Sequence, residues 1–179
     1  FEPLRVSRLV FFNKPYGVLS QFTPEDKWRA LDEFIPVRDV YVAGRLDADS
    51  EGLLILTDDG KLQAKIADPK HKLEKTYWAQ VEGVPDEVTL DRLRAGIRLS
   101  DFTAQPAKVR LIEEPPGLWQ RDPPIRFRAA IPTSWLEIRI SEGKNRQVRR
   151  MTAAIGYPTL RLIRAAIGAA TLGDLALGQ

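Results

Sequence analysis

GRLDADSEGLLILT, residues 44–57, places a polar, acid-rich loop directly before an apolar segment. The segments on either side of the loop, residues 40–43 and 53–56, have the apolar residue types of strands and are bounded by glycine or aspartate. Residues 47–52 are therefore predicted to form a loop held between two strands. Because rigid strands position loop side chains accurately, we expect functional residues here, and the carboxylate of Asp47 is the first candidate.

The composition is that of a globular protein. The chain has 179 residues, 44% of them hydrophobic, and a mean hydropathy of −0.26. This size fits one domain, or two small lobes that share a core. No run approaches the roughly 18–20 consecutive apolar residues that a membrane helix needs, and the N-terminus lacks the pattern of a secretory signal. We therefore expect a cytoplasmic protein with no membrane partner.

Metal chemistry is restricted by the residue types present. The chain has no cysteine and a single histidine, His71. Disulfides, thiolate metal sites and multi-histidine metal centres are therefore excluded.

Positive charge is concentrated in one region. The net charge is only +3, but residues 126–164 contain nine Lys or Arg and two acidic residues, a local charge of +7. Such an excess favours a polyanionic partner, because phosphate contacts gain from counterion release. The alternative is a solvated basic face without a partner.

Strands outnumber helices in the predicted pattern and do not alternate strictly with them. Apolar and β-branched residues predict strands at 8–13, 76–81, 107–112, 125–130, 135–140 and 160–166, in addition to the two beside the acidic loop. Helices or helical turns are predicted at 31–35, 61–67 and 86–95, with Gly96 ending the last of these. This order indicates an α+β fold with a mostly antiparallel, mixed sheet and flanking helices.

A further helix is predicted near the C-terminal side of the basic region. Asn145 can cap it, and Gly156 can stop it after Ile155. Its inward face would consist of Val148, Met151, Thr152 and Ile155. Three arginines, at positions 146, 149 and 150, would lie on or near the opposite arc, so that at least one can reach a neighbouring loop.

The acidic loop also matches part of a calcium-binding template. Acids at 47, 49 and 51, glycine at 52 and Asp58 at the twelfth place agree with that template. Two features disagree: a strand-like segment precedes the loop where a helix is required, and the twelfth place is not glutamate. A simpler alternative is that Asp47 only caps a turn. The chain has no nucleophile elbow, phosphate loop or dinucleotide glycine pattern.

Four segments together resemble the RsuA-type ribosomal RNA pseudouridine synthases. Residues 44–54 resemble the catalytic motif of that family, and residues 12–18 (FNKPYGV) resemble its opening strand and turn. Residues 74–77 (EKTY) are similar to its tyrosine motif and residues 142–151 (EGKNRQVRRM) to its third motif. The four segments are in the family's order over nearly the whole chain. The resemblance implies a catalytic domain over residues 1–179, with two lobes sharing one sheet, a catalytic cleft across the middle and no S4-type RNA-binding domain.

The resemblance also implies a reaction. One uridine of RNA, most simply in large-subunit (23S) ribosomal RNA, would be isomerised to pseudouridine without any cofactor, and the protein would work as a monomer. Asp47 would be the catalytic carboxylate, attacking the sugar or the base or removing a sugar proton. Arg149 would pair with Asp47 and keep it ionised. Tyr77 would stack on the target base, and Arg45 would fill the space that the everted uridine leaves.

Three further basic residues are candidates for contacts with RNA phosphates: Lys144, Arg146 and Arg150. For these residues, a solvated helix face is an equally good explanation. Two other functions stay open at this point: a non-catalytic RNA-binding module that uses the basic region, and a calcium-responsive loop protein.

Overall fold

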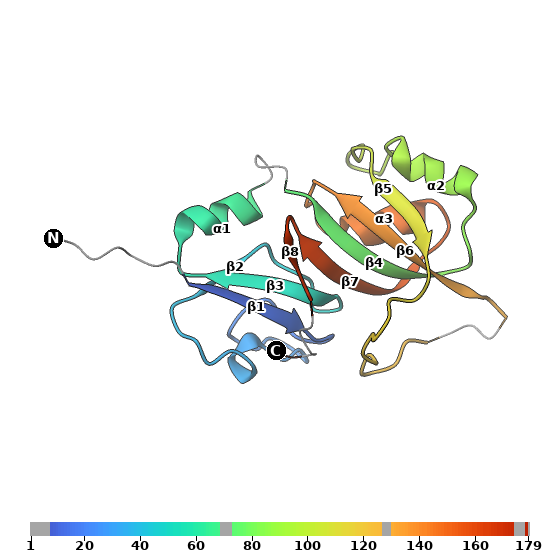
Figure 1. Ribbon diagram of the computed structural model, residues 1–179. Helices are drawn as coiled ribbons and strands as arrows, with labels where there is room; N and C mark the ends of the chain where they lie inside the picture. Colours follow the sequence, from blue (N-terminus) through green and yellow to red (C-terminus); the bar gives the residue numbers. More distant parts are fainter. Residues whose placement is uncertain (1–7, 69–72, 127–129, 174–177, 179) are drawn as a thin grey trace.

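The computed structural model describes residues 8–68, 73–126, 130–173 and 178, which form one mixed sheet with flanking helices (Figure 1). The strands are β1 (Leu9–Lys14), β2 (Tyr41–Ala43), β3 (Glu51–Thr57), β4 (Lys75–Glu82), β5 (Lys108–Ile112), β6 (Thr133–Ile140), β7 (Thr159–Ile167) and β8 (Ala170–Thr171). The helices in the described part of the chain are the 3-10 helix η1 (Leu31–Glu33), α1 (Gly60–Ala67), α2 (Glu87–Arg94) and α3 (Gln147–Ala154).

The sheet confirms the predicted α+β fold. Its strand order is β1-β3-β7-β4-β6-β5, with β2 also paired to β3 and β8 to β7. Of the seven pairings between the described strands, only the one between β3 and β7 is parallel. The sheet is therefore mixed but mostly antiparallel, as the sequence pattern indicates.

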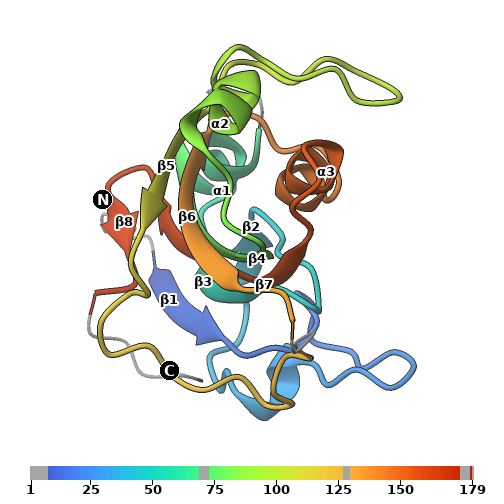
Figure 2. The same cartoon turned by 90° about the vertical axis from the view of Figure 1, so that its right-hand side faces the viewer.

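Helices cover the two halves of the sheet differently. In the β1–β3 half, apolar side chains from α1 and η1 pack on opposite faces of β3, because successive strand residues point to opposite sides (Figure 1). In the β4–β6 half, α2 and α3 pack into one apolar cluster on the same face of the curved strands (Figure 2). The start of α3 therefore lies over the face of β4 that carries its odd-numbered residues.

Strand β3 changes its partner along one edge. Along this edge, β3 pairs with β2 up to the pair of Ala43 with Ile55. Nearer its start, β3 pairs with β7 through Glu51 and Gly52. Its other edge pairs with β1 over Gly52 to Thr57. The loop of residues 44–50 leaves the sheet where β2 ends and β7 takes over, so the acidic loop lies at the junction of the two halves.

Gly52 allows the junction to close. Its φ is +109°, and a Cβ at this position would lie 2.3 Å from the backbone oxygen of Arg164. Any larger residue would force β3 and β7 apart.

A buried ion pair joins the same two strands on one face. Arg161 donates to both carboxylate oxygens of Glu51 at 2.8 and 2.9 Å, and Trp119 Nε1 donates to the same carboxylate at 2.8 Å. The side chains of Arg161 and Glu51 are 8% and 1% exposed, respectively. Because the pair is desolvated, each partner needs the other.

Capping residues explain the limits of two helices. Asp59 accepts from the backbone N–H of Lys61 (2.9 Å) and Leu62 (3.2 Å) at the start of α1. Asp86 accepts from Thr89 N–H (2.8 Å) at the start of α2. The predicted helices at 61–67 and 86–95 are confirmed, as is the turn at 31–35, which η1 occupies. Within the described residues, no helix is long and apolar enough to cross a membrane.

The predicted cap of α3 is wrong. The helix begins at Gln147, after Arg146, and Asn145 makes no cap; Arg146 has a φ of 53°. The Gln147 side chain holds the preceding loop instead, because it accepts from Lys144 N–H (3.2 Å) and donates to Glu142 (2.9 Å). The predicted inward residues of this helix, Val148, Met151, Thr152 and Ile155, are all buried.

Two other boundaries differ from the sequence prediction. Of the strand expected at 125–130, Ile125 and Arg126 lie in irregular backbone and residues 127–129 lie outside the described residues. Pro123 and Pro124 precede this segment and supply no backbone N–H for a ladder. The acidic loop is also shorter than predicted, because Glu51 and Gly52 already belong to β3.

We predict that Glu51→Ala lowers the free energy of unfolding by about 3–5 kcal/mol, because it leaves the guanidinium of Arg161 buried without its carboxylate. Urea denaturation measures this loss. Glu33→Ala is the control, because it removes a carboxylate from an exposed pair with Arg29, and it should change the unfolding midpoint little. Equal effects of the two variants would contradict a structural role for the buried pair.

Candidate active site

A cavity of about 460 Å³ lies between the acidic loop, β4 and the loop that precedes α3. Five of the seven residues predicted from the sequence line it: Arg45, Asp47, Tyr77, Lys144 and Arg146. The structure thus brings together three of the four resembling segments, which are separated in sequence. Arg149 and Arg150 do not line this cavity.

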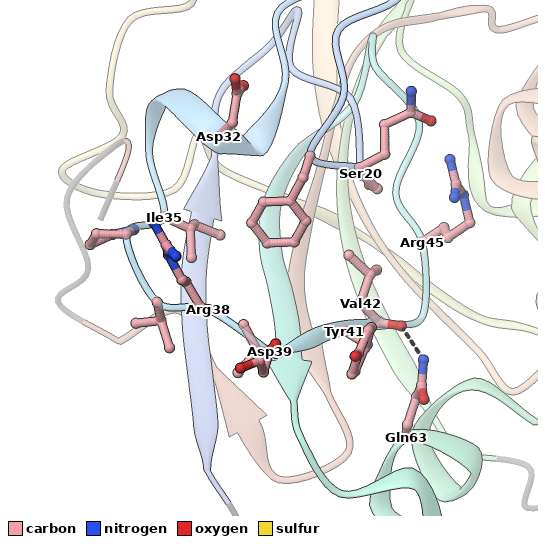
Figure 3. A pocket seen from close by; sticks show the side chains of 14 residues that line it. Ser20, Asp32, Ile35, Arg38, Asp39, Tyr41, Val42, Arg45 and Gln63 are labelled. Carbon is pink, nitrogen blue, oxygen red and sulfur yellow. Dashed lines mark hydrogen bonds between the residues drawn. The ribbon is translucent and has the colours of Figure 1, made fainter.

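A larger cavity of about 960 Å³ adjoins the first beside β2. Figure 3 shows Arg45 at its edge and the side chain of Gln63 donating to the Val42 carbonyl at 2.9 Å. The two cavities share Val42 and Arg45. We place the candidate active site in the smaller cavity, because Asp47 lines it and does not line the larger one.

Hydrogen bonds shape the loop that carries Asp47. Gly44, with a φ of +78°, turns the chain out of β2, and Ser50 N–H donates to the Asp47 carbonyl at 3.0 Å. Ser20 bonds both the carbonyl and the N–H of Leu46. A turn is therefore present at Asp47, but the hydrogen bond that closes it uses the backbone carbonyl, so the Asp47 side chain stays available to the cavity.

Two buried cations hold the same loop through its carbonyls. Arg164, 2% exposed, donates to the carbonyls of Gly44 (2.8 Å), Arg45 (3.2 Å) and Leu53 (2.9 Å). Lys14 donates to the carbonyls of Pro15 (2.9 Å), Val18 (2.7 Å) and Ala48 (3.4 Å). Burial lowers the pKa of Lys14 to about 7. The backbone of the loop is thus bound from two sides.

Arg146 makes the contact with Asp47 that was expected of Arg149. Its Nη1 lies 3.4 Å from Asp47 Oδ2, and its guanidinium binds both oxygens of Asp49 at 3.0 and 2.8 Å. Arg149 instead donates to the Asp49 carbonyl (2.8 Å) and lies 3.8 Å from the Asp49 carboxylate. The expected Arg149–Asp47 pair is therefore wrong. The left-handed backbone at Arg146 directs its side chain across to the loop, ahead of the first helical turn.

Asp49 is the acid most strongly tied to these arginines. Burial alone would raise its pKa, but the hydrogen bonds from Arg146 and the charges of Arg149 and Arg146 together hold the pKa of Asp49 below its ordinary value. Burial lowers the pKa of Arg149, and its Nε is buried with no hydrogen-bond partner among the described residues. Asp49 therefore anchors the start of α3 to the loop.

The remaining predicted residues are placed as follows. Tyr77 is half-buried on β4 and pairs in register with Arg164 of β7, so it lies beside the buried guanidinium. Arg45 is exposed at the edge of both cavities. Arg150 points to another loop, where it pairs with Asp101 and lies over the ring of Phe102.

The calcium alternative does not agree with the geometry. The Glu51 carboxylate is buried against Arg161 and that of Asp49 is bound to Arg146, so the acids of the loop do not converge on one point. In the described part of the chain, no group of three or more acidic or histidine residues could hold a metal ion.

The structural roles of Arg161 and Arg164 were not predicted from the sequence. Both count toward the basic region at 126–164, but both are buried, so they do not add to a surface for polyanions. Their position inside an apolar strand segment is the signal that could have identified them.

Comparisons with known proteins show which family the sequence resembles. The sequence profile of a family described as RNA pseudouridylate synthase matches residues 8–154. The chain is 58% identical to the "Ribosomal large subunit pseudouridine synthase E" of Vibrio parahaemolyticus, over 98% of this chain and 74% of that protein. It is 57% identical to the protein of the same name from Xanthomonas campestris, over 96% and 92% of the two chains. A solved structure titled "Crystal structure of pseudouridylate synthase" superposes with a TM-score of 0.78 at 27% identity, over 98% and 70% of the two chains.

We predict that the stabilising effect of Asp49 depends on pH. Because the folded-state pKa is depressed, the contribution is present above the ordinary aspartate pKa and is lost as pH falls through the folded-state value. Asp49→Asn should therefore destabilise the protein at pH 7, and the difference from the parent protein should shrink as the pH falls below the ordinary aspartate pKa. Urea denaturation across this range measures it, and a difference independent of pH would contradict the assignment.

Proposed function

This chain belongs to the RNA pseudouridylate synthase family, and on that premise we propose that Asp47 is its catalytic carboxylate and that the cavity beside it receives the target uridine. The protein is an isomerase that converts uridine in ribosomal RNA to pseudouridine. The proposal rests above all on one observation: Asp47, Tyr77 and Arg45 line the same cavity.

The reaction requires few groups from the protein. The bond between N1 of uracil and C1′ of ribose breaks, a bond between C5 and C1′ forms, the hydrogen at C5 leaves as a proton, and N1 gains a proton. No atom is added and nothing is oxidised. A carboxylate can serve as nucleophile toward the sugar or the base, or as base toward a sugar proton, and these three roles of Asp47 remain alternatives.

The surroundings of Asp47 suit this work. Its side chain is 43% exposed and has one long contact, at 3.4 Å, with Arg146, whereas Asp49 takes two shorter hydrogen bonds from the same guanidinium. The guanidinium of Arg146 can orient the carboxylate, and the Asp47 oxygens stay accessible from the cavity. In this proposal Arg146 orients Asp47, and Arg149 supports the loop through Asp49.

The target uridine must leave the RNA stack to reach Asp47. Tyr77 presents a half-buried ring in the cavity and would stack on the uracil. Arg45, exposed at the edge, would occupy the space that the uridine vacates, because its flat guanidinium can stack between bases. Lys144 and Arg146 are exposed, also line the cavity, and would contact RNA phosphates. Arg150 lies away from the cavity, so we propose that it contacts a phosphate of the RNA at some distance from the target uridine.

We propose that the substrate is large-subunit (23S) ribosomal RNA, because the two relatives named above are described as large-subunit enzymes. The protein would act as a monomer in the cytoplasm, where ribosomal RNA is made. A non-catalytic RNA-binding role would need only the basic residues and would not require the carboxylate of Asp47.

We predict that Asp47→Asn lowers the rate of pseudouridine formation by on the order of 10⁴-fold or more, because no other described carboxylate lines the cavity. Release of tritium from RNA labelled at C5 of uridine measures the rate, and filter binding checks that RNA affinity is retained. Asp39→Asn is the matched control, because this acid lines the larger cavity, and it should keep full activity. Turnover by Asp47→Asn would contradict the assignment of Asp47, and only an absence of turnover by the parent protein would support the non-catalytic alternative.

We also predict where the product lies. Ribosomal RNA from cells without the gene should lack a pseudouridine in the large-subunit RNA, and the gene for Asp47→Asn should not restore it. Mapping of pseudouridines in both subunits tests this prediction. A missing modification in the small-subunit RNA would contradict the proposed substrate.

A further inference from the structure

Lys75 is a half-buried lysine in the active-site cavity that the functional proposal does not use. It is the first residue of β4 and lies two positions before Tyr77, so both side chains point to the same face of the sheet. A Cβ on Gly143 would lie 3.6 Å from the ammonium. The ammonium therefore lies between β4 and the loop that precedes α3, on the side of the cavity where Tyr77 stands.

The ammonium of Lys75 has no bound partner among the described residues. No described residue forms a hydrogen bond or ion pair with it, although it shares the cavity with Asp47 and four other cations: Arg45, Lys144, Arg146 and Arg164. The donors of Arg146 and Arg164 are engaged by acids and carbonyls. Lys75 therefore keeps its three N–H groups for a ligand.

The half-buried charge of Lys75 destabilises the protein when no ligand is bound. Burial, together with the charge of Arg164, lowers the pKa of Lys75. A polar group that is partly desolvated and unpaired destabilises the free state unless a ligand compensates for it. Such a group is preorganised to meet negative charge in the cavity.

The reaction places negative charge on the uracil ring. Whichever of its three roles Asp47 takes, the N1–C1′ bond breaks with its electron pair on N1. The charge spreads to the carbonyl oxygen O2, and also to O4 while the C5–C6 double bond of the ring is intact. The proton at C5 leaves later and restores the aromatic ring after the C5–C1′ bond has formed. A cation next to O2 or O4 would stabilise the first of these steps.

We infer that the Lys75 ammonium donates to a carbonyl oxygen of the target uracil and stabilises the negative charge that collects there as the N1–C1′ bond breaks. This inference rests on the proposed function, and it makes Lys75 a second catalytic residue. A phosphate of the RNA backbone is the less suitable partner, because the exposed Arg45 and Lys144 also line the cavity and can meet it, whereas Lys75 is half-buried on the side of Tyr77.

The test compares Lys75→Met and Lys75→Arg with the parent protein under single-turnover conditions. Lys75→Met should lower the rate constant on the order of 10²-fold, the usual effect of removing one such donor, and change the Kd for RNA less than about threefold. Lys75→Arg restores the charge and should recover most of the rate. Lys61→Met, which removes an exposed lysine on α1, is the control and should keep full activity. Thermal melting verifies that each variant is folded.

A second substrate separates catalysis from a structural effect. Fluorine at C5 withdraws electrons and stabilises the uracil anion, so RNA with 5-fluorouridine at the target depends less on Lys75. The ratio of parent to Lys75→Met rate constants, measured by consumption of the nucleoside, should fall from about 10² with uridine to below about tenfold.

Three results would overturn the inference: an unchanged rate in Lys75→Met, a loss expressed in Kd alone, or the same ratio with both substrates. A loss in Kd alone would point to a phosphate contact. Asp47→Asn, measured in parallel, distinguishes this failure from that of the proposed function. If Asp47→Asn is inactive and Lys75→Met is not impaired, only the role of Lys75 is wrong.

Discussion

The parallel contact between β3 and β7 is the constraint on which the site depends. Two halves of the sheet meet there, and the closeness of their backbones requires Gly52. Arg161 and Arg164 lie three residues apart on β7 and point to opposite faces. Arg161 closes the junction through its ion pair with Glu51. Arg164 donates hydrogen bonds to backbone carbonyls beyond the point where the pairing with β2 ends. Each guanidinium is buried, and its hydrogen bonds offset the loss of solvation.

The acidic loop owes its position to this junction. It leaves β2 at Ala43 and enters β3 at Glu51, and the backbone between them is held by Arg164, Lys14 and Ser20. The start of α3 then contributes Arg146, which ties Asp49 firmly and touches Asp47. The result is a carboxylate on a fixed backbone that stays accessible from a cavity lined by cations, an arrangement suited to chemistry on a nucleotide.

Much of the fold and part of the site could be predicted from the sequence. Strand composition and capping residues such as Asp59 and Asp86 act locally, so the elements near them were predicted correctly. Arg161 and Arg164 bind partners that lie 110 and 120 residues away in the sequence, and local patterns carry no information about such partners. Arg149 was predicted beside Asp47, but Arg146 lies there. This position depends on the left-handed backbone at Arg146, which a helix pattern does not reveal.

The most direct test of the account is a crystal structure of the Asp47→Asn variant bound to an RNA fragment that the parent protein modifies. The account predicts that the target uridine is everted into the cavity of about 460 Å³, with its uracil against Tyr77 and its ribose beside residue 47. A uridine still stacked in the RNA, or lodged in the larger cavity beside β2, would contradict it.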